Sequence, residues 1–305
     1  MTDVAWIGVG AMGLPMVTRL AAEPHKIRAF DANPARCDGL TELGIEVAAS
    51  AVAAAEGAEL LVLMAATPQQ CESVLFGADE LDGPVQRGAA SALRPDATVV
   101  VMATVGPEAV EKWARRLLED GGVAMVDAPV SGGVARAARG ELLTMVGAAA
   151  PELAKVRWLL DALSARVALV GPGVGDGQRM KLVNQLLCGV HIAVAAEALG
   201  FAEALGLDAG AAYEVVTQGA AASFMLEDRG ARMVSGAFDD VHSALDIFVK
   251  DMGLVAHAAH AATYSAPIAI AAEQLYLAAQ RAGLGRLDDS ALIEVLRPGR
   301  PSGTE

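Results

Sequence analysis

The sequence is poor in cysteine and in basic residues, and each shortage excludes a class of protein. Only three cysteines occur among the 305 residues, and the odd number and wide spacing of Cys37, Cys71 and Cys188 argue against a disulfide framework or a zinc site. Lysine and arginine number 23 against 37 acidic residues, a formal net charge of −14 at pH 7. So acidic a chain repels phosphate backbones, and we expect no nucleic-acid partner. We also predict no bound metal.

Long apolar runs are missing as well. No stretch of about 18 apolar residues occurs, so we expect no membrane-spanning segment. The first apolar run, residues 4–9, has no basic segment before it and is too short for a secretion signal. We therefore expect a cytoplasmic protein with no membrane partner, and three unpaired cysteines suit that reducing compartment.

What the sequence does contain is a regular alternation of short apolar runs and helical patterns over residues 1–171. Strands that alternate with helices are typical of a parallel, doubly wound sheet, so we predict an α/β fold with an N-terminal Rossmann domain. The predicted strands are residues 4–9, 27–30, 60–64, 98–102, 123–126, 142–146 and 167–170, and the predicted helices are 12–22, 34–43, 107–119 and 151–164.

The pattern changes at the glycine-rich stretch 171–177, which we interpret as a linker. Residues 172–298 are predicted to form an all-α domain that opens with a long interdomain helix at about 176–205, and residues 299–305 to form a tail. Apolar residues lie nearly all round that helix, so we expect it to be buried on all sides. This surface predicts a homodimer or homotetramer built through the second domain. The remaining predicted helices are 209–218, 244–263, 266–282 and 289–296.

A motif of the form Gly-x-Gly-x-x-Gly follows the first predicted strand and opens the first predicted helix. In such a unit Gly8 permits the tight turn, Gly10 lets the backbone approach a pyrophosphate, and Gly13 lets the helix pack close to the strand. Backbone N–H groups at the helix N-terminus favour the negative charge of that pyrophosphate. We therefore predict a dinucleotide site with contacts from Gly8, Val9, Gly10, Ala11, Met12 and Gly13.

Asp31, at the end of the second predicted strand, indicates which dinucleotide binds. A carboxylate at this place accepts hydrogen bonds from the adenosine ribose and repels the 2′-phosphate of NADP. The next three residues are not basic, and Arg36 is the one residue nearby that moderates this preference. We predict NAD as the cofactor.

Ser131, Gly132 and Gly133 follow another predicted strand and form a candidate anion site. Consecutive backbone N–H groups on glycines, next to a hydroxyl, suit a carboxylate. The carboxyl edge of a parallel sheet is where ligands bind in this fold. An ordinary Gly-Gly turn is the alternative interpretation.

Four motifs in order, at residues 8–16, 127–133, 177–185 and 250–254, resemble those of the β-hydroxyacid dehydrogenases, the family of 3-hydroxyisobutyrate dehydrogenase and tartronate semialdehyde reductase. The resemblance covers nearly the whole chain. It implies an NAD-dependent oxidoreductase that transfers a hydride between NAD and the hydroxyl of a small 3-hydroxy or 2,3-dihydroxy carboxylic acid. It also implies that the Ser131–Gly133 segment binds this anionic substrate.

The family's active-site lysine falls on Lys181 by motif match, which implies that Lys181 is the general acid/base. Removal of a hydride from a C–OH group needs a base for the hydroxyl proton, and a lysine serves only with a pKa well below its ordinary value. Its place near a helix N-terminus and the cationic neighbours Arg179 and Lys250 are expected causes of such a shift. A surface lysine is the alternative, but the surrounding helix is too apolar for one.

The resemblance implies further site residues on the same helix. Asn184 and Gln185 lie three and four residues after Lys181, on one helix face, where amides orient the substrate hydroxyl. Many family members have Asn-Asn at this pair, so Gln185 departs from the pattern at a position usually assigned to catalysis. His191 continues along this face and is a candidate for substrate binding, although such a histidine is more often part of the core.

Three other places complete the predicted site. The resemblance implies that Lys250 approaches the nicotinamide and the substrate. Thr104 follows a strand and matches a family position near the cofactor. Ala65 and Ala66 follow another strand, and we expect backbone contacts from them to the adenosine ribose.

Finer detail favours one kind of substrate. Residues 184–193 and 243–251 resemble the L-threonate dehydrogenase group, which implies a four-carbon sugar acid, with His191 and His242 as candidates for reading its extra hydroxyls. A 3-hydroxyisobutyrate, tartronate semialdehyde or glycerate-type substrate is the alternative. Imine reductases and non-catalytic NAD-binding modules resemble this architecture too. The fold alone does not separate these classes from a dehydrogenase, but the presence of Lys181 argues against both.

Overall fold

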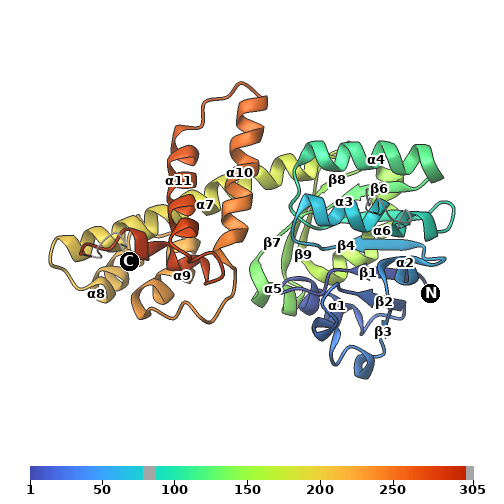
Figure 1. The fold of residues 1–305 in the computed structure, drawn as a ribbon, viewed down its shortest axis with the longest axis horizontal. Coiled ribbons are helices and arrows are strands. Elements are labelled where there is room, and N and C mark those ends of the chain that lie inside the picture. Colours follow the sequence, from blue (N-terminus) through green and yellow to red (C-terminus); the bar gives the residue numbers. More distant parts are fainter. Residues whose placement is uncertain (78–86, 300–305) are drawn as a thin grey trace, which may run out of the picture. The chain divides into compact units, whose positions relative to one another are not determined.

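The structure, a computed structural model, describes residues 1–77 and 87–299, so all but the first residue of the predicted tail lies outside the described residues. The chain divides into two compact units, Met1–Lys181 and Leu182–Glu305. The division falls within one long helix. Figure 1 shows the strands in the first unit and the helices of the second.

The first unit is built on a nine-stranded sheet. Its strands are β1 (Asp3–Ile7), β2 (Lys26–Phe30), β3 (Glu46–Val47), β4 (Leu60–Leu63), β5 (Thr98–Val101), β6 (Ala124–Asp127), β7 (Val130–Ser131), β8 (Leu142–Gly147) and β9 (Ser164–Gly171). The strand order is β3-β2-β1-β4-β5-β6-β8-β7, and β9 pairs with β8. The pairs from β3 to β6 are parallel, and the pairs of β8 with β6 and β7 are antiparallel. The chain order reverses between β1 and β4, as in a doubly wound sheet.

Helices cover both faces of this sheet, because its central strands are apolar on both sides. They are α1 (Gly13–Leu20), α2 (Ala51–Ala55), α3 (Pro68–Phe76), α4 (Pro107–Gly121), α5 (Gly133–Arg139), α6 (Ala150–Leu163) and the beginning of α7 (Asp176–Ala204). β4 and β5 are buried along their whole length. Met16 of α1 and Leu160 of α6 belong to one core cluster, and Leu75 of α3 and Trp113 of α4 to a second. The predicted α/β Rossmann architecture is confirmed.

The predicted helix at 34–43 is wrong. Two short 3₁₀ helices stand there instead, Pro34–Cys37 and Thr41–Leu43. Gly39, between them, has φ +81°, and Gly44, directly after the second, has φ +80°. Such left-handed backbone conformations end a right-handed helix, and glycine adopts them readily.

The second unit is helical throughout its described residues. After α7 come α8 (Ala209–Val216), α9 (Phe224–Ser235), α10 (Leu245–Ala261), α11 (Pro267–Arg281) and a 3₁₀ helix at Asp289–Val295. Its core joins Ile192 of α7 to Phe248 of α10 and Tyr276 of α11. The Tyr276 hydroxyl donates a 2.9 Å hydrogen bond to the carbonyl oxygen of Gly189. The all-α prediction for this domain is confirmed, while α9 was not predicted.

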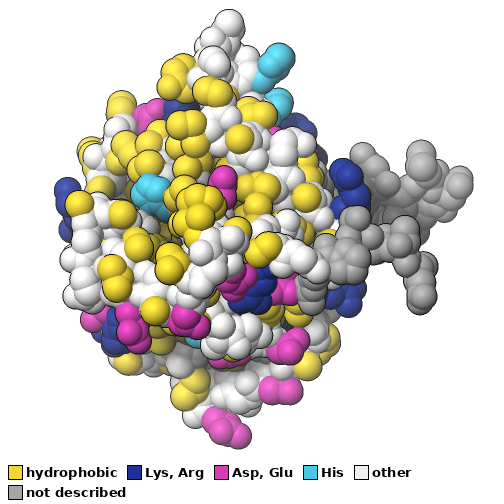
Figure 2. Space-filling view, turned by 90° about the vertical axis from the view of Figure 1, so that its left-hand side faces the viewer, with side chains coloured by type: hydrophobic (Ala, Val, Ile, Leu, Met, Phe, Trp, Pro, Cys, Tyr) yellow, Lys and Arg dark blue, Asp and Glu magenta, His cyan; other side chains and the backbone are white. Residues whose placement is uncertain are grey.

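Within the single chain, α7 is not buried on all sides. One face packs into the core of the second unit, but Val183, Leu187, Val194 and Phe201 are 57%, 50%, 53% and 62% exposed. The spacing of these four side chains places them along one side of the helix. On the face of the second unit that Figure 2 shows, hydrophobic side chains gather into a broad area.

By length and composition alone, α7 is a helix that could cross a membrane, with a mean hydropathy of 1.5 over its most apolar 18 residues. Of that window, 44% is buried inside the protein. The core helix of a soluble protein passes the same test, so this is weak evidence for a membrane span.

Candidate active site

The glycine loop between β1 and α1 is closed by two residues that tolerate no side chain. Gly8 has φ +101°, and a Cβ atom there would lie 2.4 Å from the carbonyl oxygen of Met64. At Gly13 a Cβ atom would lie 2.0 Å from the carbonyl oxygen of Gly8. The Trp6 indole N–H donates to the same Gly8 oxygen at 3.0 Å. The turn from β1 into α1 is therefore tight, and the hydrogen bond from the Trp6 side chain stabilises it.

Gly10, by contrast, faces open space. The nearest atom to a Cβ built there is Nη1 of Arg36, at 3.8 Å. The N-cap of α1, Met12, provides no side-chain hydrogen bond to the backbone N–H groups of the first turn. The helix dipole favours an anion at this point, which lies where the strand order reverses. The loop thus fits the pyrophosphate of a dinucleotide.

Asp31 follows β2 and is turned toward the glycine loop. Its Oδ2 accepts a 2.8 Å hydrogen bond from the backbone N–H of Val9, and its Oδ1 accepts one of 2.9 Å from that of Asn33. The Arg36 guanidinium lies 3.5 Å from Oδ1 and is 54% exposed. One carboxylate and one accessible cation therefore stand together beside the loop.

Two further strand ends contribute loops to the same edge of the sheet. Ala65 and Ala66 follow β4, and the N–H of Ala66 donates to Oε1 of Gln70 in α3 at 3.2 Å. Thr104 follows β5 and is half-buried. Since β4 pairs with both β1 and β5, these loops are neighbours of the glycine loop.

Asp127, at the end of β6, is a site residue that sequence reasoning missed. It is fully buried, and its Oδ2 accepts hydrogen bonds from the backbone N–H groups of Gly175 (3.1 Å) and Gln178 (2.8 Å). The Gln178 side-chain amide donates to Oδ1 at 2.9 Å. Burial raises the pKa of Asp127 from 3.8 to about 6, although the hydrogen bonds from Gln178 and Gly175 counter that effect.

Gln178 was missed as well, and it links this carboxylate to the loop after β5. Its side-chain oxygen accepts from the N–H groups of Val105 (2.9 Å) and Gly106 (3.0 Å), and its amide nitrogen donates to the Ala103 oxygen at 3.0 Å. The first turn of α7 is thereby attached to two strand ends. Lys181 lies one turn further along α7 and is only 7% exposed. Both missed residues stand inside the motifs at 127–133 and 177–185, so the motifs themselves were the available signal.

The Ser131–Gly133 segment turns sharply from β7 into α5. Gly132 has φ +143° and Gly133 has φ +74°, conformations that favour glycine. Ser131 pairs with Leu143 of β8 and is half-buried. Consecutive residues with positive φ present their N–H groups in an unusual direction, which agrees with a role in anion binding but leaves that role a prediction.

In the second unit, Asn184, Gln185 and Lys250 are joined by Asp251. Nδ2 of Asn184 donates to Oε1 of Gln185 at 2.9 Å, and Nε2 of Gln185 donates to Oδ2 of Asp251. Nζ of Lys250 lies 2.8 Å from Oδ1 of Asp251. Asp251 is 2% exposed and Gln185 is 6% exposed. The predicted residues are therefore held by a buried carboxylate to which the sequence analysis gave no role.

The two histidines are placed differently. His191 is half-buried on α7 and stands outside this network. His242 is half-exposed, and its ring lies 3.2 Å from the Asp240 carboxylate. The His242 backbone N–H donates to the buried Asp288 at 2.9 Å.

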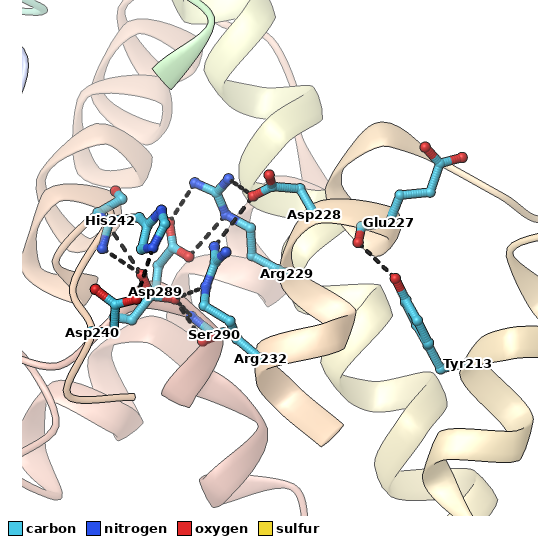
Figure 3. A network of polar contacts seen from close by, with 11 residues as sticks. Tyr213, Glu227, Asp228, Arg229, Arg232, Asp240, His242, Asp289 and Ser290 are labelled. Atoms are coloured by element: carbon cyan, nitrogen blue, oxygen red, sulfur yellow. Dashed lines mark hydrogen bonds and ion pairs between the residues drawn. The ribbon is translucent and has the colours of Figure 1, made fainter. Parts of the chain in front are cut away.

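Figure 3 shows the ion-pair cluster around that segment, in which Arg229 and Arg232 meet two buried carboxylates. Arg229 binds Asp289 through two hydrogen bonds of 3.0 Å, and Arg232 binds Asp288 at 3.0 Å. Burial raises the pKa of Asp289, against the opposing effect of Arg229. Its partners come from α9 and from the loop before α10, so this cluster connects elements of the second unit.

Two family models match consecutive parts of the chain. The NAD binding domain of 6-phosphogluconate dehydrogenase matches residues 3–171. The model described as NAD-binding of NADP-dependent 3-hydroxyisobutyrate dehydrogenase matches residues 175–296.

Relatives and solved structures match along the whole length. The chain is 37% identical to L-threonate dehydrogenase of Cupriavidus necator over 297 residues, which is 97% of this chain and 96% of the relative. It is 32% identical to 2-hydroxy-3-oxopropionate reductase of Escherichia coli, covering 96% of each chain. A crystal structure of 3-hydroxyisobutyrate dehydrogenase from Salmonella typhimurium has 34% identity and a TM-score of 0.88, covering 97% of this chain and 100% of that one.

Proposed function

Because the chain belongs to the family of β-hydroxyacid dehydrogenases that resemble 3-hydroxyisobutyrate dehydrogenase, we propose that it oxidises a small 3-hydroxy or 2,3-dihydroxy carboxylic acid, with L-threonate favoured. The protein is an NAD(P)-dependent oxidoreductase. The relative named L-threonate dehydrogenase supports a four-carbon sugar acid as substrate. The relative named 2-hydroxy-3-oxopropionate reductase supports a smaller, tartronate semialdehyde or glycerate-type substrate as the alternative.

We propose NAD rather than NADP as the preferred form of the cofactor. The carboxylate of Asp31 next to the glycine loop suits a ribose with free hydroxyls and repels a 2′-phosphate. The exposed guanidinium of Arg36, 3.5 Å from Asp31, weakens that repulsion, so we expect a preference rather than an absolute selection.

The observation that carries the proposal is the burial of Lys181 beside an anchored turn. Lysine is rarely so buried, and here Gln178 and Asp127 fix the helical turn before it. In the oxidation, Lys181 as the free amine takes the proton of the substrate hydroxyl, and in the reverse reaction its ammonium returns that proton to the carbonyl oxygen. The segment Ser131–Gly133 holds the substrate carboxylate through backbone N–H groups. Bound NAD supplies the acceptor for the hydride.

A substrate panel tests this proposal. L-threonate, D-erythronate, 3-hydroxyisobutyrate, D-glycerate and 3-hydroxypropionate are each offered with NAD, and NADH is followed by its absorbance. We expect the highest kcat/KM with L-threonate. Activity confined to 3-hydroxyisobutyrate would remove the sugar-acid assignment and leave the reaction class standing.

The role of Lys181 is tested with Lys181→Met, which keeps the length of the side chain and removes the amine. We expect kcat to fall about 10²- to 10⁴-fold, the usual contribution of a general acid/base. The Kd for NADH, measured by fluorescence, should stay within about threefold, since a lysine placed at the hydroxyl does not carry the cofactor contacts. Lys112→Met is the matched control, because Lys112 is 60% exposed and pairs with Glu72 on the surface. A nearly normal kcat in Lys181→Met would refute the assignment.

A further inference from the structure

Four side chains of the second unit form one continuous line of polar contacts. Asn184 donates to Gln185, Gln185 donates to Asp251, and the other oxygen of Asp251 faces the ammonium of Lys250. Gln185 and Asp251 are buried, so water does not compete for these contacts. We call these four residues the amide relay.

The relay has a fixed direction because Gln185 contacts a carboxylate, that of Asp251. An ionised carboxylate only accepts hydrogen bonds, so Gln185 must turn its NH₂ group toward Asp251. The oxygen of Gln185 then points the other way, and it can only accept. Asn184 must therefore turn its own NH₂ group toward Gln185. The second contact of that NH₂ group, 3.4 Å to Sγ of Cys188, agrees with this orientation.

This orientation of the Asn184 amide determines what its side-chain oxygen can bind. Its nitrogen is occupied by Gln185 and Cys188, whereas among the described residues its Oδ1 accepts no hydrogen bond. Asn184 is half-buried rather than enclosed. It therefore presents an acceptor, and an acceptor selects an O–H donor such as an alcohol.

Gln185 is the residue of the right length for this connection. An asparagine at this position would be shorter by one methylene, about 1.5 Å, and would lose contact with Asp251. The departure of Gln185 from the usual family pattern is thus matched by a contact in the structure.

We propose that Asp251 and Gln185 are positioning residues that set the polarity of Asn184, so that its oxygen accepts a hydrogen bond from a substrate hydroxyl other than the one whose proton Lys181 takes, while Asp251 also holds Lys250 in place. This inference rests on the proposed function, because it assigns the substrate contact to Asn184. It goes beyond that function in stating which atom of Asn184 meets the substrate and what determines it.

Three variants and one exchange test the relay. Gln185→Met keeps the volume and removes both hydrogen bonds. Asp251→Asn keeps the shape but supplies a donor as well as an acceptor, so the direction is no longer imposed. Gln185→Glu brings two carboxylates into contact. Each should lower kcat/KM for the hydroxy acid about 10- to 100-fold, the effect of losing one or two buried hydrogen bonds.

The double exchange Gln185→Glu with Asp251→Asn is the sharpest test. The carboxylate of residue 185 then accepts from both Asn184 and the amide at 251, so the Asn184 oxygen again faces outward. We expect the exchange to recover at least about tenfold of the kcat/KM lost in Asp251→Asn, a non-additive result that independent structural effects do not give. A double variant worse than both single variants would overturn the proposal.

A second measurement is independent of turnover. The side-chain NH₂ protons of Asn184 are bonded to Gln185 in the relay, so their exchange with solvent, followed by NMR, should be at least about tenfold faster in Gln185→Met. Unchanged exchange would overturn the relay even if the enzyme were impaired. If the Asn184 protons exchange faster in Gln185→Met but the wild-type protein oxidises none of the acids in the substrate panel, the relay stands and the proposed function is contradicted.

Gln280→Met is the matched control for these variants. Gln280 is an exposed glutamine of α11 whose amide donates to Asp246 at 2.7 Å, outside the relay. It should leave kcat/KM within about twofold, as surface substitutions usually do. The Kd for NADH should stay within about threefold in the variants changed at Gln185 alone, with the loss appearing in kcat and in the substrate KM.

Discussion

At the scale of single residues, the choice of cofactor depends on a pair of opposite charges. The Asp31 carboxylate is oriented by two backbone N–H groups, and Arg36 stands 3.5 Å away with more than half of its side chain exposed. At 3.5 Å and with an exposed guanidinium this ion pair is weak, so the guanidinium is free to change partners. The carboxylate therefore decides the preference for as long as it is present.

Replacing that carboxylate should change the preference. In Asp31→Ser the repulsion of a 2′-phosphate is gone, and Arg36 becomes a partner for the phosphate. We expect kcat/KM with NADP to rise at least about tenfold and kcat/KM with NAD to fall, because the ribose hydroxyls lose their acceptor. Adding Arg36→Met to this variant should remove the gain with NADP. A wild-type protein that already prefers NADP would contradict the whole interpretation.

Sequence reasoning at this scale succeeded where a motif places one residue in one role. The glycine motif identified Gly8 and Gly13, whose positions leave no room for a side chain. It did not identify Asp127 or Gln178, because these two residues stand 51 residues apart, and the motifs that contain them do not indicate that their side chains meet. The functions of Ser131, Lys181 and Lys250 stay predictions.

At the scale of secondary-structure elements, the contacts of Asp127 and Gln178 join three of them. They connect the ends of β5 and β6 to the first turn of α7, which carries Lys181. A buried polar network of this kind stabilises one arrangement only when every member is satisfied. Its loss should therefore displace Lys181 without unfolding the sheet.

Asp127→Asn tests this connection through pH. Because the pKa of Asp127 is raised to about 6 in the folded protein, its contribution to stability is complete below pH 3.8 and declines as the pH rises through 6. The asparagine does not titrate. Relative to the variant, the wild type should therefore lose up to about 3 kcal/mol in the free energy of unfolding between pH 4 and pH 7.

Urea unfolding of both proteins at pH 4.5 and pH 7 measures this difference. Asparagine also places an NH₂ group against that of Gln178, so kcat should fall about tenfold or more even where the variant is folded. A stability difference that is the same at both pH values would contradict the assigned burial effect.

Element boundaries were predictable wherever an apolar run was long enough. Apolar runs predicted the longer strands of residues 1–171. They did not predict β3 and β7, because a strand of two residues shows no alternation. The helix α9 was missed because charged residues interrupt its pattern, although Ser223 caps it by accepting from the N–H of Leu226. The predicted helix at 289–296 is a 3₁₀ helix, which the periodicity of so short a segment does not distinguish.

At the scale of the whole molecule, the main feature is the apolar side of α7 that a single chain leaves exposed. An apolar helix was expected to be enclosed, yet Leu187, Val194 and Phe201 are at least half exposed. A groove of about 500 Å³ lies beside Val194 and Phe201, and its lining consists of Val194, Glu197, Ala198, Gly200, Phe201 and Ala204 of α7 together with Leu296 and Pro298. Exposed apolar patches of this kind mark interaction surfaces, so a homodimer or homotetramer remains our expectation.

Charge substitutions on this side of α7 test the expectation. Light scattering of the wild type at micromolar concentration should give the mass of a dimer or tetramer rather than 31.1 kDa. The double variant Leu187→Glu with Val194→Glu should shift the protein to a smaller species, because each new carboxylate would be buried without a partner. Leu118→Glu on α4, where the leucine is 65% exposed, is the control and should leave the mass unchanged. A monomeric wild type would count against the proposed surface.

The continuity of α7 also limits how this protein can change over evolutionary time. Lys181 and Asn184 lie on one uninterrupted helix, less than a full turn apart. One inserted residue between them would rotate Asn184 by about 100° around the helix axis relative to Lys181, and no loop is available there to absorb the error. We therefore expect the number of residues between these two positions to be invariant among active homologues, whereas the loops at strand ends remain free to vary in length.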